Sequence, residues 1–313
     1  MIAILISCYL RRVLPRTVLV LILLVIGLTR CGSDDGGSES QERRAVIAAF
    51  YPLAWAAERV GGDTVDVRNL TPPGTEPHDL ELSPRDVEAI RSADLVLYIG
   101  QGFQPAVEDA LEGADGEAVD LLAGQRLLAG EAHEDEHEAE GEEDHELESD
   151  PHIWLDPTRM AEIADRIATA LGSPGEAAAL DRELRTLDGD FRRALANCQR
   201  REVVTSHAAF GYLAARYGLE QVPITGLSPE VEPTPRDLEE VVEHVRETKA
   251  TTIFFETLVS PRLAETVARE TEAETAVLDP IEGIAQDDLD RGADYLSVMR
   301  ENLASLRRAL GCR

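Results

Sequence analysis

The first part of the chain alternates short apolar runs with segments whose apolar residues recur three and four positions apart. Apolar runs of about 4–8 residues are typical of buried strands, and the longer spacing is typical of amphipathic helices. Strands that alternate with helices form βαβ units, so the pattern predicts an α/β fold with a mostly parallel sheet. The predicted strands are residues 45–50, 64–70, 95–99 and 118–122.

A long helical segment separates this region from a second one with the same alternation. Apolar side chains recur at helical spacing through residues 176–197, which predicts an amphipathic helix of about six turns. We interpret this helix as a link between two lobes. The predicted strands of the second lobe are residues 203–206, 221–225, 251–255 and 275–278, and its predicted helices are residues 208–217, 235–249, 261–270 and 288–310.

These patterns divide the chain into four parts. They are a leader with a polar linker (1–41), an N-terminal α/β lobe (45–171), a linking helix (174–198) and a C-terminal α/β lobe (201–313). Within the first lobe, residues 131–149 form an acidic loop that also contains histidine.

The N-terminus has the pattern of a targeting segment. Arg11, Arg12 and Arg16 precede the apolar run 17–28, which is too short for a comfortable membrane span. Cys31 follows, and a cysteine just after the apolar core of a leader resembles a bacterial lipoprotein signal, in which that cysteine is lipidated. We therefore expect an extracytoplasmic protein held at the membrane through Cys31, with a cleaved or retained anchor as the alternative.

The chain is strongly acidic, with a net charge of -30. This charge argues against nucleic acid as a partner, because phosphates attract a basic face. It suits an extracytoplasmic protein or one that handles cations, and solubility alone is the other interpretation. The charge is unevenly spread, since residues 131–150 hold twelve of the sixty acidic residues.

Two cysteines remain after those of the leader. Cys198 and Cys312 form an even pair in a compartment expected to be oxidising, so we predict a disulfide between them. Two free buried thiols are the alternative.

Three histidines are placed where ligand-binding residues of α/β proteins occur. His78 lies in a turn-rich loop after a predicted strand, and His207 follows a strand of the second lobe. His152 lies in a segment stiffened by Pro151 and Pro157. Three neutral imidazoles and one carboxylate suit a tetrahedral Zn²⁺ site, so these histidines are the predicted metal ligands.

Carboxylates near these histidines could complete the site. Asp279 follows a predicted strand, as His207 does, and is the predicted fourth ligand, with water as the alternative. Glu256 is predicted to support the site or the fold rather than to bind the metal. Asp156 is predicted to cap a helix or to support a ligand.

Several motifs together resemble a known family. They are Glu76-Pro77-His78, Asp150-Pro151-His152-Ile153-Trp154-Leu155-Asp156-Pro157, Ser206-His207-Ala208-Ala209-Phe210-Gly211-Tyr212-Leu213, Glu232-Pro233-Thr234-Pro235 and Leu278-Asp279-Pro280. Their order and spacing resemble those of the solute-binding proteins of zinc/manganese ABC importers, the cluster A-I group. The resemblance runs from about Ala45 to the C-terminus.

The resemblance implies a fold and a site. The family has two four-stranded, mostly parallel α/β lobes joined by one long rigid helix, with a metal site in the cleft between them. Its ligands carry over to His78, His152, His207 and Asp279. Zinc-type members have a histidine where manganese-type members have a glutamate, and His207 occupies that position. An acidic, histidine-containing insertion before the second ligand is also a zinc-type feature.

The acidic loop contains His133, His137 and His145 and has two interpretations. Histidine and carboxylate both bind Zn²⁺, so the loop could be a low-affinity zinc trap or regulator. Alternatively, it is a solvated, disordered loop without a role, since Leu147 is its one large apolar residue.

The predicted function is extracytoplasmic capture of Zn²⁺ and its delivery to an ABC permease powered by an ATPase, by a monomer that is not an enzyme. A manganese or iron importer subunit is an alternative within the same family. A zinc hydrolase, which needs three ligands and a water, and a surface adhesin are alternatives from other classes.

Overall fold

The computed structural model describes residues 43–130 and 147–313. Cys31 and the three histidines of the acidic loop, His133, His137 and His145, lie outside these ranges. The first sheet has the strand order β2-β1-β3-β4, and all of its pairings are parallel. Its strands are β1 (Arg44–Ala48), β2 (Val65–Asn69), β3 (Leu95–Tyr98) and β4 (Glu117–Asp120).

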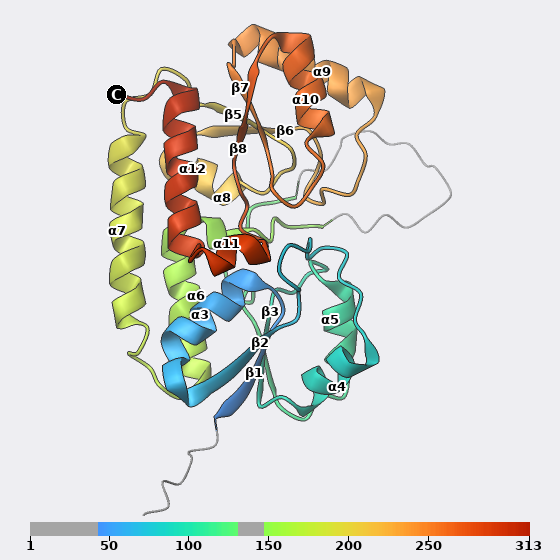
Figure 1. The fold of residues 1–313 in the computed structure, drawn as a ribbon, viewed down its shortest axis with the longest axis vertical. Helices are drawn as coiled ribbons and strands as arrows, with labels where there is room; N and C mark the ends of the chain where they lie inside the picture. The colour runs from blue at the N-terminus through green and yellow to red at the C-terminus, as the bar shows by residue number, and fades with distance from the viewer. Residues whose placement is uncertain (1–42, 131–146) are drawn as a thin grey trace, which may run out of the picture. The chain divides into compact units, whose positions relative to one another are not determined.

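Helices cover both faces of the first sheet (Figure 1). Helix α3 packs on β1 and β2 and against α6, whereas α4 and α5 lie together on the other side. The capping box of Ser83 and Asp86 starts α4, with Pro84 in its first turn. The helical segments are α3 (Tyr51–Gly61), η1 (Gly62–Thr64), α4 (Pro84–Ser92), α5 (Pro105–Ala110), η2 (Ile153–Leu155) and α6 (Pro157–Ala170).

The second sheet repeats the topology of the first, with the order β6-β5-β7-β8 and parallel pairing throughout. Its strands are β5 (Glu202–Thr205), β6 (Glu220–Pro223), β7 (Thr252–Phe255) and β8 (Glu274–Val277). Its helices are α8 (Gly211–Tyr217), α9 (Pro235–Thr248), α10 (Arg262–Thr271), α11 (Gln286–Asp290) and α12 (Tyr295–Leu310).

The predicted α/β class with two four-stranded parallel sheets is confirmed. The predicted C-terminal helix is instead two helices, because Gly292 takes a left-handed conformation (φ 86°) and Asp294 then caps α12. The helix expected from residue 208 begins only at Gly211. The Ala208 N–H donates to the carbonyl of Gly226, which connects this segment to the loop after β6.

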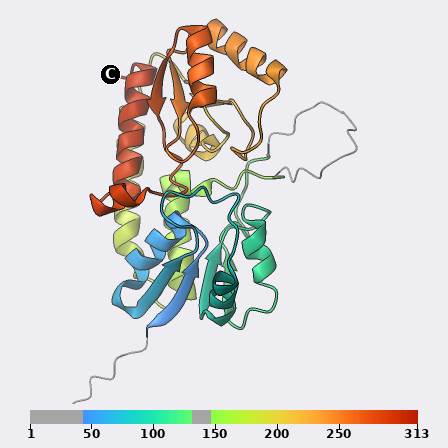
Figure 2. The same ribbon diagram turned by 45° about the vertical axis from the view of Figure 1, so that its right-hand side comes forward.

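The predicted linking helix corresponds to α7 (Ala178–Ala194), which packs against α6 and α12 (Figures 1 and 2). Its apolar face belongs to a core shared by the first sheet, α6 and α12, whereas a second, smaller apolar cluster lies beneath α9 and α10. A rigid linking role for α7 stays a prediction. In the described part of the chain, no helix has both the length and the apolar composition needed to cross a membrane.

Asp188 connects α7 to α8. Its carboxylate accepts hydrogen bonds from Arg216 (2.9 Å), Arg192 (3.0 Å) and the Tyr217 hydroxyl (3.3 Å). Partial burial alone would raise the pKa of Asp188, but the two guanidinium groups outweigh it and hold that pKa below its usual value. The folded state therefore favours the charged carboxylate.

A covalent link joins the end of α7 to the end of α12. The sulfur atoms of Cys198 and Cys312 lie at bonding distance, 1.96 Å, and the residues are 114 positions apart. The Gln199 N–H also donates to the carbonyl of Leu310, and the Arg313 N–H donates to that of Asn197. The C-terminus is thus fixed to the segment that enters the second sheet.

We predict that Asp188→Asn lowers the free energy of unfolding at pH 7 by about 1.5–3 kcal/mol, the usual value of hydrogen bonds to a charged group. Because the folded-state pKa is depressed, this stabilisation is present above the unfolded pKa of about 3.9 and is lost as pH falls through the folded pKa. Urea unfolding at pH 7 and pH 3 measures the difference.

The matched control is Asp190→Asn, on the same helix, whose carboxylate is 41% exposed and pairs with Arg193. An exposed pair contributes about 0–1 kcal/mol, so this control is expected to change little. Equal effects of the two substitutions at pH 7 would contradict a special role for Asp188.

We also predict that reducing the bond between Cys198 and Cys312 destabilises the protein by about 2–5 kcal/mol, because the bond closes a long loop in the unfolded chain. The urea midpoint of the wild type is expected to fall on addition of a reductant. A double serine variant at these positions should start at the lower midpoint and show no response to reductant, and a response there would point to another cause.

Candidate metal centre

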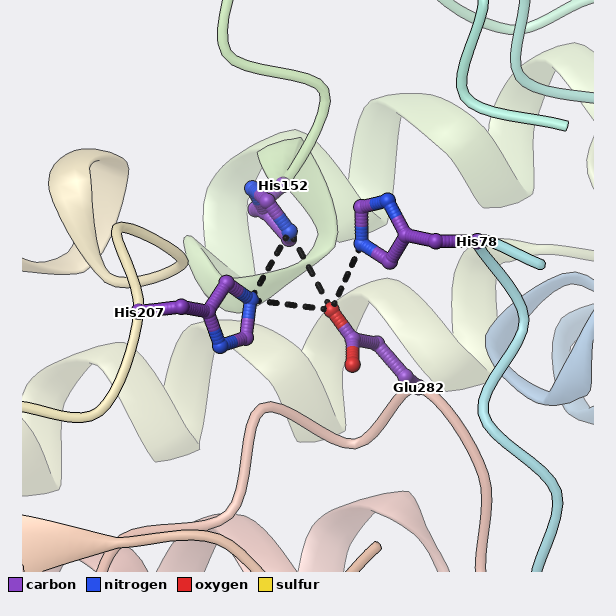
Figure 3. Close-up of side chains that lie close together, drawn as sticks. All are labelled: His78, His152, His207 and Glu282. Atoms are coloured by element: carbon purple, nitrogen blue, oxygen red, sulfur yellow. Dashed lines mark hydrogen bonds and ion pairs between the residues drawn. The ribbon is translucent and has the colours of Figure 1, made fainter. Parts of the chain in front are cut away.

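Three histidines and one glutamate bring their ligand atoms together in the interior (Figure 3). They are His78, His152, His207 and Glu282, and one atom from each lies within 4.8 Å of all the others. All four residues are buried. Buried groups of this kind either pair or hold a metal, because unpaired burial is costly.

Four of the six separations between the ligand atoms match those of a tetrahedral site, and the other two are within 4.8 Å. Glu282 Oε1 lies 3.1 Å from the Nε2 atom of His152 and 3.4 Å from those of His207 and His78. The Nε2 atoms of His152 and His207 are 3.4 Å apart. Tetrahedral ligands with zinc bonds of about 2.0–2.1 Å are about 3.3–3.4 Å from one another. A zinc ion therefore fits the donor set and its spacing.

Each ligand comes from a loop rather than from a helix or strand interior. His78 lies between β2 and α4, His152 directly precedes η2, His207 lies between β5 and α8, and Glu282 lies between β8 and α11. Loops beyond the carboxyl ends of parallel strands are where such sheets bind ligands. The duplicated topology thus supplies ligands from both lobes.

Two carboxylates orient the histidine rings. Asp150 Oδ1 lies 2.8 Å from His152 Nδ1, and Glu256 Oε1 lies 2.7 Å from His207 Nδ1. Each carboxylate also accepts the backbone N–H of its histidine. With the Nδ1 proton donated to a carboxylate, the Nε2 lone pair faces the site, which is the usual arrangement of metal-binding histidines.

His78 is held differently. Its backbone N–H donates to Glu76 Oε2 at 2.9 Å, and its ring contacts the edge of Phe103. Neither His78 Nε2 nor Glu76 Oε1 has a hydrogen-bond partner in the described part of the chain. Burial, and next the charge of Glu282, raise the pKa of Glu76 to about 9. An unpartnered buried nitrogen that faces the other three ligand residues fits a metal ligand.

The ligands stabilise one another electrostatically. Burial alone would raise the pKa of Glu282, but the charge of His207 and the hydrogen bonds of Glu282 with His152 and His207 hold that pKa well below its usual value. Burial lowers the pKa of His78. It also opposes the charging of His152 and His207, yet their carboxylate partners raise both pKa values, most strongly that of His207.

The structure places Glu282, not Asp279, among the three histidines. The Asp279 carboxylate instead accepts hydrogen bonds from the Thr257 hydroxyl and the Ile281 N–H, both at 2.7 Å. Burial raises the pKa of Asp279 to about 6, against these two hydrogen bonds. The expectation that Asp279 is the fourth ligand is therefore replaced by Glu282.

Sequence reasoning missed two residues of the site, Glu282 and Asp150. Glu282 is the one acid in the apolar run from Pro280 to Ile284, and a lone acid in such a run was the available signal. Asp150 precedes His152 by two positions. This spacing is visible in the sequence, but the sequence analysis assigned Asp150 no role.

Glu256 and Asp156 were predicted to support the site or the fold rather than to bind the metal, and their contacts agree with such roles. Glu256 contacts His207 rather than the centre of the site. Asp156 caps α6 by accepting the Thr158 N–H at 2.8 Å and also lies 3.6 Å from Arg216.

Comparison with known proteins supports this picture. Residues 46–309 match the family model described as the periplasmic component A of the zinc-uptake complex, ZnuA. The chain is 35% identical over 298 residues to the zinc-binding lipoprotein AdcA of Streptococcus pneumoniae. That alignment covers 91% of this chain and 59% of AdcA, so the chain spans less than two thirds of that relative.

Two further similarities cover most of both chains. The high-affinity zinc uptake system protein ZnuA of Bacillus subtilis is 32% identical over 90% of this chain and 92% of its own length. The crystal structure of the Zn(II)-bound ZnuA-like domain of S. pneumoniae AdcA superposes with a TM-score of 0.70 at 33% identity, covering 86% of this chain and 99% of that domain. With its matched length, its two parallel sheets and its cluster of histidines, the chain belongs to the ZnuA family.

Proposed function

We propose that this protein captures Zn²⁺ outside the cytoplasm and delivers it to the permease of an ABC importer. The observation that carries the proposal is the spacing of the four buried ligand atoms, 3.1–3.4 Å for the pairs that involve Glu282. The zinc-binding names of the relatives and the zinc-bound structure of the AdcA domain support it.

The donor set favours zinc over manganese. Three imidazole nitrogens with one carboxylate oxygen suit Zn²⁺, whereas Mn²⁺ is better matched by oxygen ligands. The His207 side chain is central to this choice, because it supplies the third nitrogen and is held by Glu256. Zinc is accordingly the proposed cargo.

The closed ligand set favours binding over catalysis. Catalytic zinc sites keep one position open for water or substrate, and structural sites fill all four. Here Glu282 Oε1 faces all three histidines and would fill the fourth position. A carrier also needs no reaction on the metal, so capture and release suffice.

The family supports a proposal for location and partners. The family model describes a periplasmic component of an uptake complex, and relatives that include AdcA of Streptococcus pneumoniae are named lipoproteins. We infer a location outside the cytoplasm with anchorage through a lipid on Cys31, and transfer of zinc as a monomer to a permease driven by an ATPase.

We predict that Glu282→Gln raises the zinc dissociation constant by more than the roughly 10–100-fold that loss of a residue supporting a ligand causes. The amide keeps the shape of the side chain but is a much weaker zinc ligand than the carboxylate. Competition against a chelator of known zinc affinity measures the constant.

The control for this experiment is Glu239→Gln, an exposed glutamate on α9. It changes the same chemical group at a distance from the site and should leave zinc affinity unchanged. Weak zinc binding by the wild type would overturn the proposed function. Unchanged zinc binding by Glu282→Gln would overturn the assignment of Glu282 as the fourth ligand.

The cargo is tested in cells that express the protein. Deleting its gene is expected to slow growth when zinc is chelated, and added zinc should restore growth whereas added manganese should not. The gene for the wild type should restore growth at low zinc, and the gene for Glu282→Gln should fail to do so. Restoration by manganese alone would identify a manganese importer instead.

A further inference from the structure

The turn that carries Glu282 has a backbone conformation that its sequence disfavours. Ile281, directly before Glu282, has φ 56°, in the left-handed region. A β-branched residue rarely adopts this region, because its branched side chain crowds the backbone there. Ile281 is also fully buried, so its side chain cannot relax into solvent. The surrounding structure must therefore impose this conformation.

The Asp279 side chain supplies one part of that constraint. Its Oδ1 atom accepts the Ile281 N–H at 2.7 Å, which closes a local turn two residues long. Its Oδ2 atom accepts the Thr257 hydroxyl at 2.7 Å, which fixes the carboxylate to the loop after β7. The Asp279 carboxylate thus links Thr257 to Ile281, the residue next to Glu282, through two hydrogen bonds.

The backbone of the same turn is fixed on two further sides. Asn302 of α12 accepts the Asp279 N–H at 2.9 Å and donates to the Asp279 carbonyl at 2.7 Å. The indole N–H of Trp154 donates to the Pro280 carbonyl at 2.8 Å. These bonds hold the backbone of residues 279 and 280. The bond that Asp279 Oδ1 accepts from the Ile281 N–H then fixes the backbone at Ile281.

The turn is also placed against the loop of His78. The Gly74 N–H donates to the Ile284 carbonyl at 3.1 Å. A side chain at Gly283 would meet the Thr75 carbonyl oxygen at 3.2 Å, so the two loops are in close contact. A change of direction at Ile281 would therefore move Glu282 relative to His78 as well as relative to His152.

We propose that Asp279 is a positioning residue, whose hydrogen bond to the Ile281 N–H imposes the left-handed turn that aims Glu282 at the three histidines. This inference rests on the proposed function, since it assigns Asp279 a role in zinc affinity. It differs from a ligand role, in which Asp279 would bind zinc itself, because the carboxylate that lies among the three histidines is that of Glu282 (Figure 3).

Two substitutions at Asp279 separate the roles. Asp279→Asn keeps an Oδ1 acceptor for the Ile281 N–H and presents an amide to the Thr257 hydroxyl, which can accept as well as donate. We expect its zinc dissociation constant to stay within about threefold of the wild type, whereas Asp279→Ala raises the constant about 10–100-fold. A ligand role predicts instead that Asn weakens binding as much as Ala.

A double-mutant cycle tests whether Asp279 acts through Glu282. Zinc affinity of the full-length protein is measured for the wild type, Asp279→Ala, Glu282→Gln and the double variant, by competition with a chelator. Adding Asp279→Ala to Glu282→Gln should cause no further loss. A loss of the same size in both backgrounds would show general structural damage and would overturn the proposal.

Thr257→Val provides a second route if Asp279→Ala does not fold. Thr257 is exposed, so its replacement is expected to be tolerated, and it removes one of the two hydrogen bonds that fix the carboxylate. We expect a loss of zinc affinity of about 2–10-fold, the effect of one hydrogen bond, and no loss in the Glu282→Gln background. No effect in either background would count against a role of the Thr257–Asp279 hydrogen bond in positioning Glu282.

The outcomes also separate this inference from the proposed function. Absence of zinc binding by the wild type would remove the function and the inference together. Tight binding by the wild type, weakened by Glu282→Gln but equally weakened by Asn and Ala at position 279, would remove only the positioning role.

Discussion

One buried carboxylate oxygen facing three imidazole nitrogens is the interaction on which the site depends. Burying an isolated carboxylate costs several kcal/mol of desolvation free energy, and Glu282 is almost fully buried. The three histidines compensate for this cost and hold the pKa of Glu282 low. Asp150 and Glu256 in turn keep two of the rings turned toward Glu282. Once the nitrogens that face Glu282 give up their protons, the same arrangement presents three nitrogen lone pairs and one carboxylate oxygen to a metal ion.

The duplicated topology explains why such an arrangement is available. In both sheets the central strands run parallel and their connecting loops lie beyond the same ends. Loops are free to carry ligands because the strands and helices already bury the apolar residues. The second lobe contributes His207 and Glu282 from such loops, and the first contributes His78 and His152. A metal held by all four therefore joins the two lobes chemically.

Much of this was predictable from residue patterns. Strand and helix alternation gave the α/β class, and the histidines were recognisable because each follows a strand or lies beside prolines. Glu282 could not be recognised as a ligand in this way, because its position depends on the left-handed turn at Ile281. Residue type argues against a left-handed isoleucine, and the bonds that impose it come from Asp279, Thr257 and distant Asn302. Long-range hydrogen bonds of this kind leave no periodic trace in a sequence.

The indole of Trp154 has a consequence beyond packing. It lies two residues after His152, its ring centroid is 5.2 Å from that of His152, and its N–H is bonded to the carbonyl two residues before Glu282. A ligand from each half of the chain is thus joined to the same rigid aromatic ring, so neither can shift without changing the surroundings of the other. The chain has two tryptophans, and the emission of an indole depends on its surroundings, so the fluorescence of Trp154 is expected to respond to the arrangement of these two ligand-bearing segments.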